Sequence, residues 1–299
     1  MKIGIITRRE NNPNLEEALE SIRNWEKSHS TKIVYEDEKN LKKCDAIVAV
    51  GGDGTVLSAA HIAFEKQTPI VGINAGRVGF LADYKLEEIS IVLNSLASGD
   101  FGTQNRIMLD GSVFSKGTIG KGKKNKKILN RTVLNEIFLH AHAPQRMINL
   151  EVKINDKFLT EYWADSLMLA TPTGSTAYNL AAGGPIIYPS AEAFVLNPVN
   201  PMSLSVRPLI IPSNCECKIR CVAGSTAEMV FDGHFSEQLN EGEELRICKS
   251  KFLTRFARIN TPADKAKCTD TKDSDKDGFV QALKEKLGWT GKITGTSRT

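Results

Sequence analysis

The sequence predicts an α/β domain with a parallel sheet, followed by a second domain that is all β in character. Two observations support this division. The first hundred residues alternate between short apolar strand patterns and helical stripes, which is typical of a parallel sheet covered by helices. Beyond about Gly102, short alternating runs dominate, with turn residues between them. We therefore expect an α/β domain at 1–103, a β-rich domain at 104–262, and a C-terminal linker and helix at 263–299.

Hydrophobic periodicity places the elements of the first domain. Short apolar or β-branched runs predict strands at Ile3–Thr7, Lys32–Tyr35, Ala46–Val50 and Pro69–Ile73. Apolar residues at helical spacing predict helices within 15–25, at Thr55–Phe64 and within 86–96.

The second domain is expected to contain one helix among many short strands. The helix is expected at Thr176–Ala182, because Gly183-Gly184-Pro185 supplies a C-cap and then a helix breaker. A last amphipathic helix is expected at Gly278–Leu287. The expected strands are Arg106–Leu109, Val133–His140, Asn149–Ile154, Phe158–Trp163, Ser166–Ala170, Leu204–Pro208, Cys215–Val222, Ala227–Phe231 and Glu244–Cys248.

Length and composition limit the class of protein. The chain has 299 residues, enough for about two domains, and its 41% hydrophobic and 25% charged residues match soluble globular proteins rather than disordered or fibrous ones. No apolar run approaches the ~18 residues of a membrane helix, and the first residues lack the pattern of a signal peptide. Cys215, Cys217 and Cys221 share one strand face, so we interpret them as core thiols of a cytoplasmic protein.

The positive charge of the chain is concentrated in one stretch. Six lysines lie between Ser112 and Asn130, and without them the net charge of +4 becomes −2. We interpret Lys116–Lys127 as a solvated hairpin tip rather than a polyanion site. Neither nucleic acid nor a membrane is therefore expected as a partner.

The strongest chemical signal is Gly51-Gly52-Asp53-Gly54-Thr55, where an apolar strand ends and a helix begins. Glycine amides at a helix N-terminus bind anions, so Gly51, Gly52 and Thr55 are candidates for a phosphate loop, with Thr55 as the N-cap. Asp53 is unusual there, since a carboxylate repels phosphate unless it binds a metal or accepts a proton. Both roles belong to phosphoryl transfer. An Asx turn at a loop tip explains the motif about as well.

Two further segments combine polar residues with apolar strands. Thr171–Asn179 opens the helix of the second domain, and its hydroxyl groups predict a polar pocket wall, although an ordinary Ser/Thr-rich turn is the simpler interpretation. Asn135-Glu136 interrupts an apolar run, and Asp165 precedes an apolar strand. Such groups are costly to bury unless they are hydrogen-bonded, so they indicate a site.

Taken together, these segments resemble the NAD kinase family. The resemblance covers nearly the whole chain in the family's order, and it implies a β-sandwich-like second domain and a C-terminal helix that returns to the first domain. The run Thr171–Tyr178 is much more specific to NAD kinases than the first motif. The resemblance rests on Gly51–Thr55, Gly72–Gly76, Gly79-Phe80-Leu81, Leu134-Asn135-Glu136, Asp165, Thr171–Tyr178, Gly183-Gly184-Pro185, Arg207-Pro208-Leu209, Asp232-Gly233 and Leu287-Gly288-Trp289.

This resemblance implies a phosphotransferase that converts NAD to NADP. ATP, or inorganic polyphosphate in some members, donates a phosphoryl group to the 2′-hydroxyl of the adenosine ribose, with Mg²⁺ or another divalent cation on the donor phosphates. Asp53 is implied as the catalytic proton acceptor, and family members are commonly homodimers or homotetramers. The implied nucleotide-binding residues are Gly54, Asn135, Glu136, Arg146, Trp163, Asp165, Thr173, Thr176, Ala177, Tyr178, Asn179, Leu180, Ala181 and His234.

Three members of that set depart from the family's pattern or vary within it. Trp163 stands where many members have arginine, His234 where many have glutamine, and Arg146 where members vary among basic residues. Two alternative functions stay open at this point. One is a kinase of the same fold that acts on a lipid or sugar hydroxyl, and the other is a dinucleotide-binding sensor without catalysis. The sensor is disfavoured because Asp53 and the Asn135-Glu136 pair are all present.

Overall fold

The chain folds into two compact units in a computed structural model that describes residues 1–7, 13–35, 38–76, 79–115, 126–141, 147–222, 224–259 and 278–289. The first unit comprises Met1–Asn105 and Thr254–Thr299, and the second comprises Arg106–Leu253. The second unit ends before the expected residue 262. The reason is that strand β17 (Glu244–Arg258) continues into the first unit, where Phe256 pairs with Ile70.

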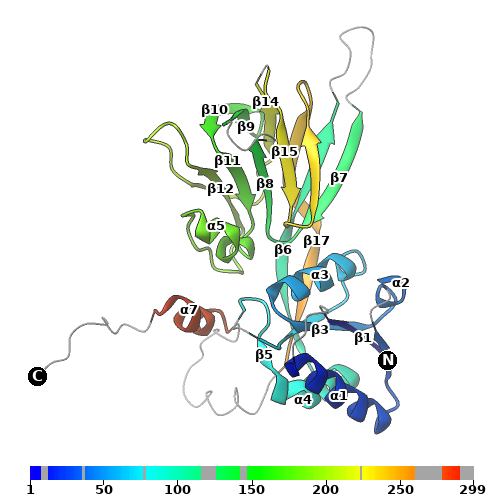
Figure 1. Cartoon of the computed structure of the whole chain (residues 1–299). Helices are drawn as coiled ribbons and strands as arrows, with labels where there is room; N and C mark the ends of the chain where they lie inside the picture. The colour runs from blue at the N-terminus through cyan, green and yellow to red at the C-terminus, as the bar shows by residue number, and fades with distance from the viewer. Residues whose placement is uncertain are drawn as a thin grey trace, which may run out of the picture. The chain divides into compact units, whose positions relative to one another are not determined.

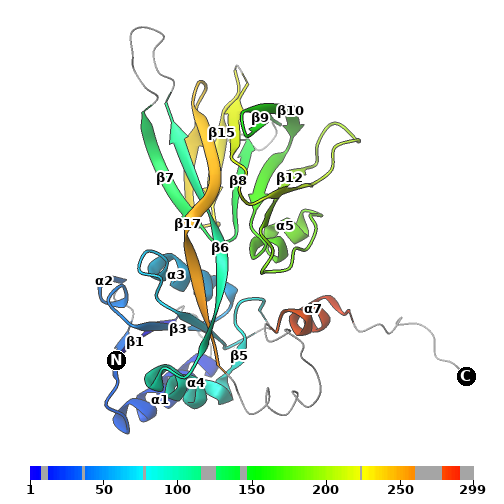
Figure 2. The ribbon, with the colours of Figure 1, turned by 180° about the vertical axis from the view of Figure 1, so that it is seen from behind.

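The first unit is built on a parallel sheet with helices on both faces. Helices α1 (Pro13–Lys27) and α4 (Ile89–Ser98) lie against one face of the sheet and α3 (Asp53–Ala63) against the other, as Figures 1 and 2 show. Helix α7 (Phe279–Leu287) also belongs to this unit, as the resemblance implied. The sheet order is β2 (Lys32–Tyr35), β1 (Lys2–Thr7), β3 (Ala46–Gly51), β4 (Ile70–Asn74) and β5 (Tyr84–Lys85). The helices are α1 (Pro13–Lys27), α2 (Glu38–Leu41), α3 (Asp53–Ala63), the 3₁₀ turn η1 (Leu86–Glu88), α4 (Ile89–Ser98) and α7 (Phe279–Leu287).

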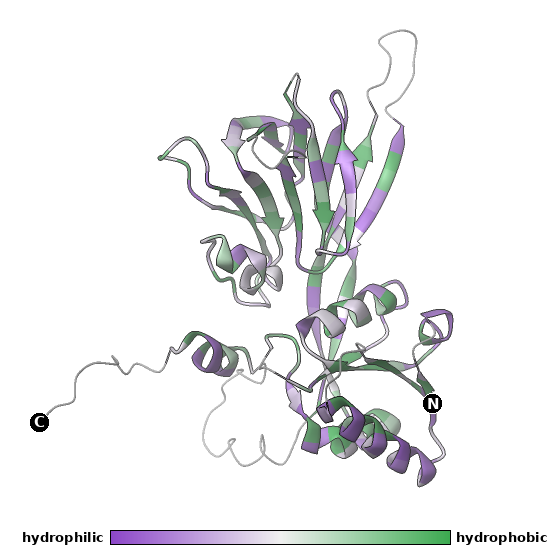
Figure 3. Ribbon diagram, viewed as in Figure 1, coloured by the Kyte–Doolittle hydropathy of each residue, from purple (hydrophilic) through white to green (hydrophobic). Residues whose placement is uncertain are grey.

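Burial explains why these strands are continuous apolar runs. Side chains of β1 such as Ile5 pack in one cluster with Trp25 of α1 and Leu93 of α4. Val56 on α3 is fully buried and lies next to β4 at Gly72. A parallel sheet covered on both faces needs apolar residues at successive positions. Figure 3 shows this as hydrophobic colour on β1 and β3 beside the hydrophilic outer side of α1.

The second unit is a sandwich of two sheets, in agreement with the predicted β-sandwich-like domain. Apolar side chains from both sheets form its core, with Val152 and Ile219 from one and Leu167 and Phe231 from the other. The first sheet contains β10 (Lys157–Ala164), β9 (Ile148–Ile154), β14 (Cys217–Cys221) and β17, with β6 (Gly102–Phe114) and β7 (Lys127–Val133) beside β17. The second, antiparallel sheet has the order β13 (Leu209–Pro212), β12 (Ala193–Val199), β11 (Ser166–Ala170), β8 (Glu136–Ala141), β15 (Ala227–Phe231) and β16 (Phe235–Leu239).

Three expectations about local structure in the second unit are wrong. Leu204–Pro208 is not a strand, since Leu204 is 87% exposed and the segment makes a turn in which the Val206 amide bonds Ser203. The predicted helix Thr176–Ala182 is split at Ala177 into a 3₁₀ turn η2 (Gly174–Thr176) and a short helix α5 (Tyr178–Ala181). The predicted strand Val133–His140 is interrupted at Leu134 and Asn135, which separate β7 from β8.

The prediction of core thiols in the second unit agrees with the structure. Cys217 and Cys221 are buried and Cys215 is partly buried, and burial raises the pKa of the Cys217 thiol to about 12. Strands β6 and β7 pair as a hairpin from Leu109↔Val133 to Phe114↔Lys127. Residues 116–125 of the lysine-rich stretch lie outside the described part of the chain. Among the described residues, no helix is long and apolar enough to cross a membrane.

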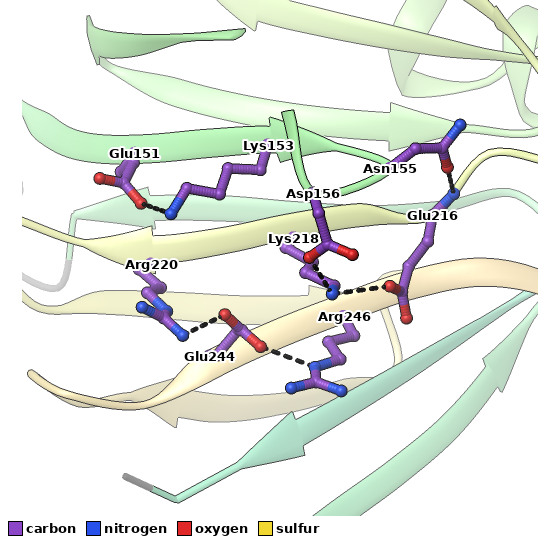
Figure 4. Close-up of polar contacts among 9 residues, drawn as sticks. All are labelled: Glu151, Lys153, Asn155, Asp156, Glu216, Lys218, Arg220, Glu244 and Arg246. Carbon is purple, nitrogen blue, oxygen red and sulfur yellow. Dashed lines mark hydrogen bonds and ion pairs between the residues drawn. The ribbon is translucent and has the colours of Figure 1, made fainter. Parts of the chain in front are cut away.

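A network of charged side chains covers the first sheet of the second unit outside its core (Figure 4). Lys218 on β14 pairs with Asp156 at 2.5 Å. Glu244 at the start of β17 is buried and pairs with Arg220 at 2.5 Å and with Arg246 at 2.6 Å. Two charge-assisted contacts offset the cost of burying the Glu244 carboxylate.

Candidate functional site

In the first unit, the chemistry is concentrated on the carboxylate of Asp53. This residue begins α3, and Gly52, the N-cap of the helix, separates it from the end of β3. Its Oδ2 accepts a hydrogen bond from the amide of Phe80 at 2.9 Å, and its Oδ1 accepts one from Leu81 at 3.0 Å. The expectation that Thr55 caps the helix is wrong, because Thr55 is buried inside the first turn. Two backbone donors therefore set the orientation of Asp53.

Close contacts explain two glycines beside this carboxylate. A Cβ at Gly79 would lie 1.9 Å from Oδ1 of Asp53, so only glycine permits the loop after β4 to approach the carboxylate. A Cβ at Gly51 would lie 2.4 Å from Oγ1 of Thr55. The motif glycines therefore provide close backbone packing around Asp53 and Thr55.

Lys286, at the end of α7, is a third neighbour of Asp53 that the sequence analysis missed. Its Nζ lies 3.6 Å from Oδ2 of Asp53 and 4.2 Å from the centre of the Phe80 ring. The Asp53 side chain remains 37% exposed, so it is also accessible to a ligand. The sequence offered a signal for this residue, because Lys286 directly precedes the family motif Leu287-Gly288-Trp289.

In the second unit, Asp232 holds the segment that contains Asn135 and Glu136. Its Oδ2 accepts the amide of Leu134 at 2.7 Å, and its Oδ1 accepts those of Asn135 at 2.7 Å and Glu136 at 3.0 Å. Hydrogen bonds from three amides to one carboxylate are charge-assisted and hold the backbone of this segment in place. They explain why the chain bends at Asn135 where the apolar pattern predicted a continuous strand.

Glu136 is a buried acid with spare hydrogen-bonding capacity. Burial, followed by the nearby charge of Asp232, raises the pKa of Glu136 to about 8. Its Oε2 and the Oδ1 of Asn135 are buried and have no hydrogen-bond partner among the described residues. Buried polar atoms are normally paired, so these two atoms are suited to receive a ligand.

The run Thr171–Asn179 packs against the same segment. Oγ1 of Thr171 donates to the carbonyl of Leu134 at 2.5 Å, and the amide of Thr171 donates to that of Asn135 at 2.8 Å. A Cβ at Gly174 would lie 2.2 Å from the Asn135 carbonyl oxygen, so glycine is needed there. Thr173 is buried in this turn. The structure thus packs the turn that contains Thr173 against Leu134 and Asn135 through its neighbours Thr171 and Gly174.

The remaining residues of this run differ in their exposure. Tyr178 is exposed and packs edge-on against Phe138, while Thr176, Ala177 and Leu180 are partly buried and Ala181 is exposed. Asn179 is fully buried. Its amide donates to the carbonyls of Ser175 and Pro185, each at 3.1 Å, and it accepts from Asn197 at 3.0 Å. The contacts of Asn179 therefore hold the turn together.

The other predicted residues lie at separate points of the second unit. Asp165, between β10 and β11, is exposed and accepts a hydrogen bond from Asn200 at 2.9 Å. Trp163 on β10 is half exposed. Nδ1 of His234 lies 2.8 Å from the carbonyl oxygen of Asp232, whereas Arg146 lies outside the described residues. Within the described part of the chain, no group of three His, Cys, Asp or Glu side chains could hold a metal ion.

Comparison with known proteins assigns the chain to a family. Residues 5–101 match the model of the ATP-NAD kinase N-terminal domain, and residues 134–259 match that of the ATP-NAD kinase C-terminal domain. The NAD kinase of Sulfurimonas denitrificans is 30% identical over 96% of this chain and 97% of its own length. The chain belongs to the NAD kinase family. The NAD kinase of Moorella thermoacetica is 36% identical over 74% of this chain and 69% of its own length.

Solved structures of NAD kinases share the fold. The yeast NADH kinase complexed with NADH superimposes with a TM-score of 0.81 at 23% identity, covering 99% of this chain and 90% of that one. An Archaeoglobus fulgidus NAD kinase in complex with ATP gives a TM-score of 0.71 at 23% identity, with coverages of 94% and 99%. The family resemblance and the fold class predicted from the sequence are confirmed, and the chain is a member of a phosphotransferase family.

Proposed function

We propose that this chain transfers the terminal phosphoryl group of ATP to the 2′-hydroxyl of the adenosine ribose of NAD, which gives NADP and ADP. The observation that carries this proposal is the carboxylate of Asp53, held by two amides at the start of α3, in a member of the NAD kinase family. A lipid or sugar kinase of the same fold has less support, because the match to the NAD kinase models includes the second unit.

In the proposed reaction, Asp53 is the proton acceptor. A ribose hydroxyl is a very weak acid, so its proton must be removed as its oxygen bonds to the phosphorus atom. Asp53 takes that proton while the bond from the phosphorus to the bridging oxygen breaks and ADP leaves. The amides of Phe80 and Leu81 restrict the carboxylate to one orientation, as general-base catalysis requires.

The proposed site for the adenosine of NAD is the segment held by Asp232. Because its pKa is raised to about 8, Glu136 is protonated at a pH below that value and can donate a hydrogen bond as well as accept one. Asn135 Oδ1 offers a second acceptor. We assign Asn179 a supporting role in the turn, because its amide is used within the protein. The other proposed contacts are Gly54, Asp165, Thr173, Thr176, Ala177, Tyr178, Leu180 and Ala181, together with Trp163, Arg146 and His234, the three positions that depart from the family's pattern or vary within it.

A divalent cation such as Mg²⁺ is proposed to arrive on the phosphates of the donor. The described residues fit this arrangement, since Asp53 is one carboxylate already bonded to two amides rather than part of a cluster of protein ligands. The cation would neutralise the phosphate charge. Gly51 and Gly52 would face those phosphates. Inorganic polyphosphate carries the same chemistry and is the alternative donor.

The assembly proposed is a cytoplasmic homodimer or homotetramer without nucleic acid or membrane partners. Exposed apolar side chains that lie near one another support an oligomer. The side chains of Trp163, Met202 and Leu204 are 50%, 68% and 87% exposed, and the Met202 amide donates a hydrogen bond to the Trp163 carbonyl. Exposed apolar groups of this kind mark interaction surfaces. The mass measured by light scattering as the protein elutes from a size-exclusion column tests the proposed oligomeric state.

One assay tests the proposed reaction. The purified chain is incubated with NAD, Mg²⁺ and either ATP or polyphosphate, and NADP is measured with a coupled dehydrogenase. NADP formation with ATP is expected. Phosphorylation of a lipid or sugar in place of NAD would favour the related kinase, and NAD binding without turnover would favour the sensor.

A further inference from the structure

We propose that Lys286 is a positioning residue for Asp53, so that the C-terminal helix α7 must be docked for phosphoryl transfer to proceed. This inference rests on the proposed function, because it assigns Asp53 the role of proton acceptor. It adds Lys286, a residue near the C-terminal end of the sequence, to that function. The family motif at Leu287-Gly288-Trp289 does not include this lysine.

The contact between the two charges is direct. Nζ of Lys286 lies 3.6 Å from Oδ2 of Asp53, the oxygen that also accepts the amide of Phe80. The two side chains are 21% and 37% exposed, so the pair is partly screened from water. Attraction between charges strengthens as solvent is excluded. The ammonium thus restrains one oxygen of the carboxylate in addition to the amides.

Phe80 connects the pair to the backbone. Its amide donates to Asp53, and its ring lies 4.2 Å below Nζ of Lys286, within the range of a cation–π contact. Lys286 therefore interacts with the carboxylate and with the residue that orients it. A lysine that merely covered the surface would not need both contacts.

Packing of α7 brings Lys286 to this position. Phe279 and Leu283 are buried, and the ring of Phe279 lies 6.2 Å from that of Phe80. Residues 279, 283 and 286 fall on one helical face, so docking of the apolar edge places the ammonium beside Asp53. The cation also lies in the last turn of the helix, where the helix dipole favours it. Lys284 is exposed on the same helix and is the matched control.

The test compares Lys286→Met, Lys286→Gln and Lys286→Arg with Lys284→Met, each measured for kcat, for the KM of both substrates and for melting temperature. Misplacement of a reacting group costs up to ~100-fold in rate, so we expect a fall in kcat of about 10- to 100-fold for the Met and Gln variants. The melting temperature should change little, because ion pairs that keep contact with water add little stability. The KM values should also change little, because the proposed role of Lys286 is to hold Asp53 and not to bind a substrate. Lys286→Arg should recover most of the rate, and Lys284→Met should match the wild type.

A double variant separates action through Asp53 from action on the donor. If Lys286 works through Asp53, adding Lys286→Met to Asp53→Asn causes no further loss of turnover. A full additional loss, or a rise confined to the KM of the donor, would show that the ammonium screens phosphates and would overturn the inference. Wild-type kcat in both Lys286→Met and Lys286→Gln would also overturn it. Failure of the proposed function is seen separately, since the wild type would then form no NADP.

Discussion

The carboxylate of Asp232 accepts a hydrogen bond of 2.7 Å from the backbone amide of Asn135, which lies 97 positions earlier in the chain. Bonds from Leu134 and Glu136 complete this contact. The break between β7 and β8 is therefore stabilised by specific hydrogen bonds within the second unit. It places two buried polar atoms, on Asn135 and Glu136, where a ligand can pair with them.

Replacing Asp232 tests how much its three hydrogen bonds to backbone amides contribute to stability and to NAD binding. Asp232→Asn places an amide group among three backbone donors, and a buried donor without an acceptor costs about 1–3 kcal/mol. We expect a lower melting temperature and a higher KM for NAD, with kcat less affected. Glu237→Gln, which removes an exposed ion pair with Arg131, is the control and should be close to neutral. A normal KM and melting temperature for Asp232→Asn would contradict this assignment.

Asp53→Asn should remove the proton acceptor while preserving the size of the side chain. General-base assistance accounts for about 10²–10⁴ in rate, so turnover should fall by at least that order while the affinity for NAD changes little. Initial rates and NAD titrations measure the two quantities. If the variant regains its rate at high Mg²⁺, Asp53 serves to hold the metal instead. Near-native turnover at ordinary Mg²⁺ would contradict the role of Asp53 as the proton acceptor.

Glu136→Gln should change the dependence of stability on pH. The pKa of Glu136 is raised from 4.5 to about 8 in the folded protein. Between these values the unfolded chain has lost the proton and the folded chain retains it, so the wild type loses stability as pH rises, by up to about 1.4 kcal/mol per pH unit. Glutamine does not titrate. Melting temperatures from pH 5 to 8 should show a growing advantage for the variant, and parallel curves would refute the buried proton.

Glu244→Gln should weaken the second unit through its ion-pair network. The neutral amide leaves Arg220 and Arg246 without their buried anion, and hydrogen bonds to charged groups contribute about 1.5–3 kcal/mol. Because both arginines remain partly exposed, we expect a loss near the lower end of that range in chemical denaturation. Glu151→Gln breaks the more exposed pair with Lys153 and should have little effect. Equal losses in the free energy of unfolding for the two variants would contradict the larger contribution assigned to Glu244.

The lysine-rich stretch should be dispensable. Strands β6 and β7 pair up to Phe114↔Lys127, so a Gly-Ser turn in place of residues 116–125 can join them. This stretch has little apolar surface to bury. We expect unchanged melting and turnover in the shortened chain. A large rise in the KM of the donor would instead assign the lysines to phosphate binding.

Local sequence patterns predicted most of the first unit. The strands at Ile3–Thr7 and Ala46–Val50 are continuous apolar runs, and burial on both faces of a parallel sheet produces such runs directly. In the second unit, the same patterns misplaced a strand at Leu204–Pro208 and missed β12, β13 and β16. Alternation there depends on which partner strand covers each face, and one segment does not carry that information.

The candidate site was likewise predicted only in its local parts. The sequence by itself determined that Asp53 sits in a glycine turn at the start of a helix and that Asn135 and Glu136 are polar residues within an apolar run. Only the tertiary structure decided what restrains them: Phe80 and Lys286 beside Asp53, and Asp232 beneath Asn135. Periodicity and turn chemistry extend over a few residues, whereas the shortest of these contacts, from Phe80 to Asp53, spans 27 positions and that from Asn135 to Asp232 spans 97. Such pairings arise when distant segments pack, because burial then leaves amides and charges that need a partner.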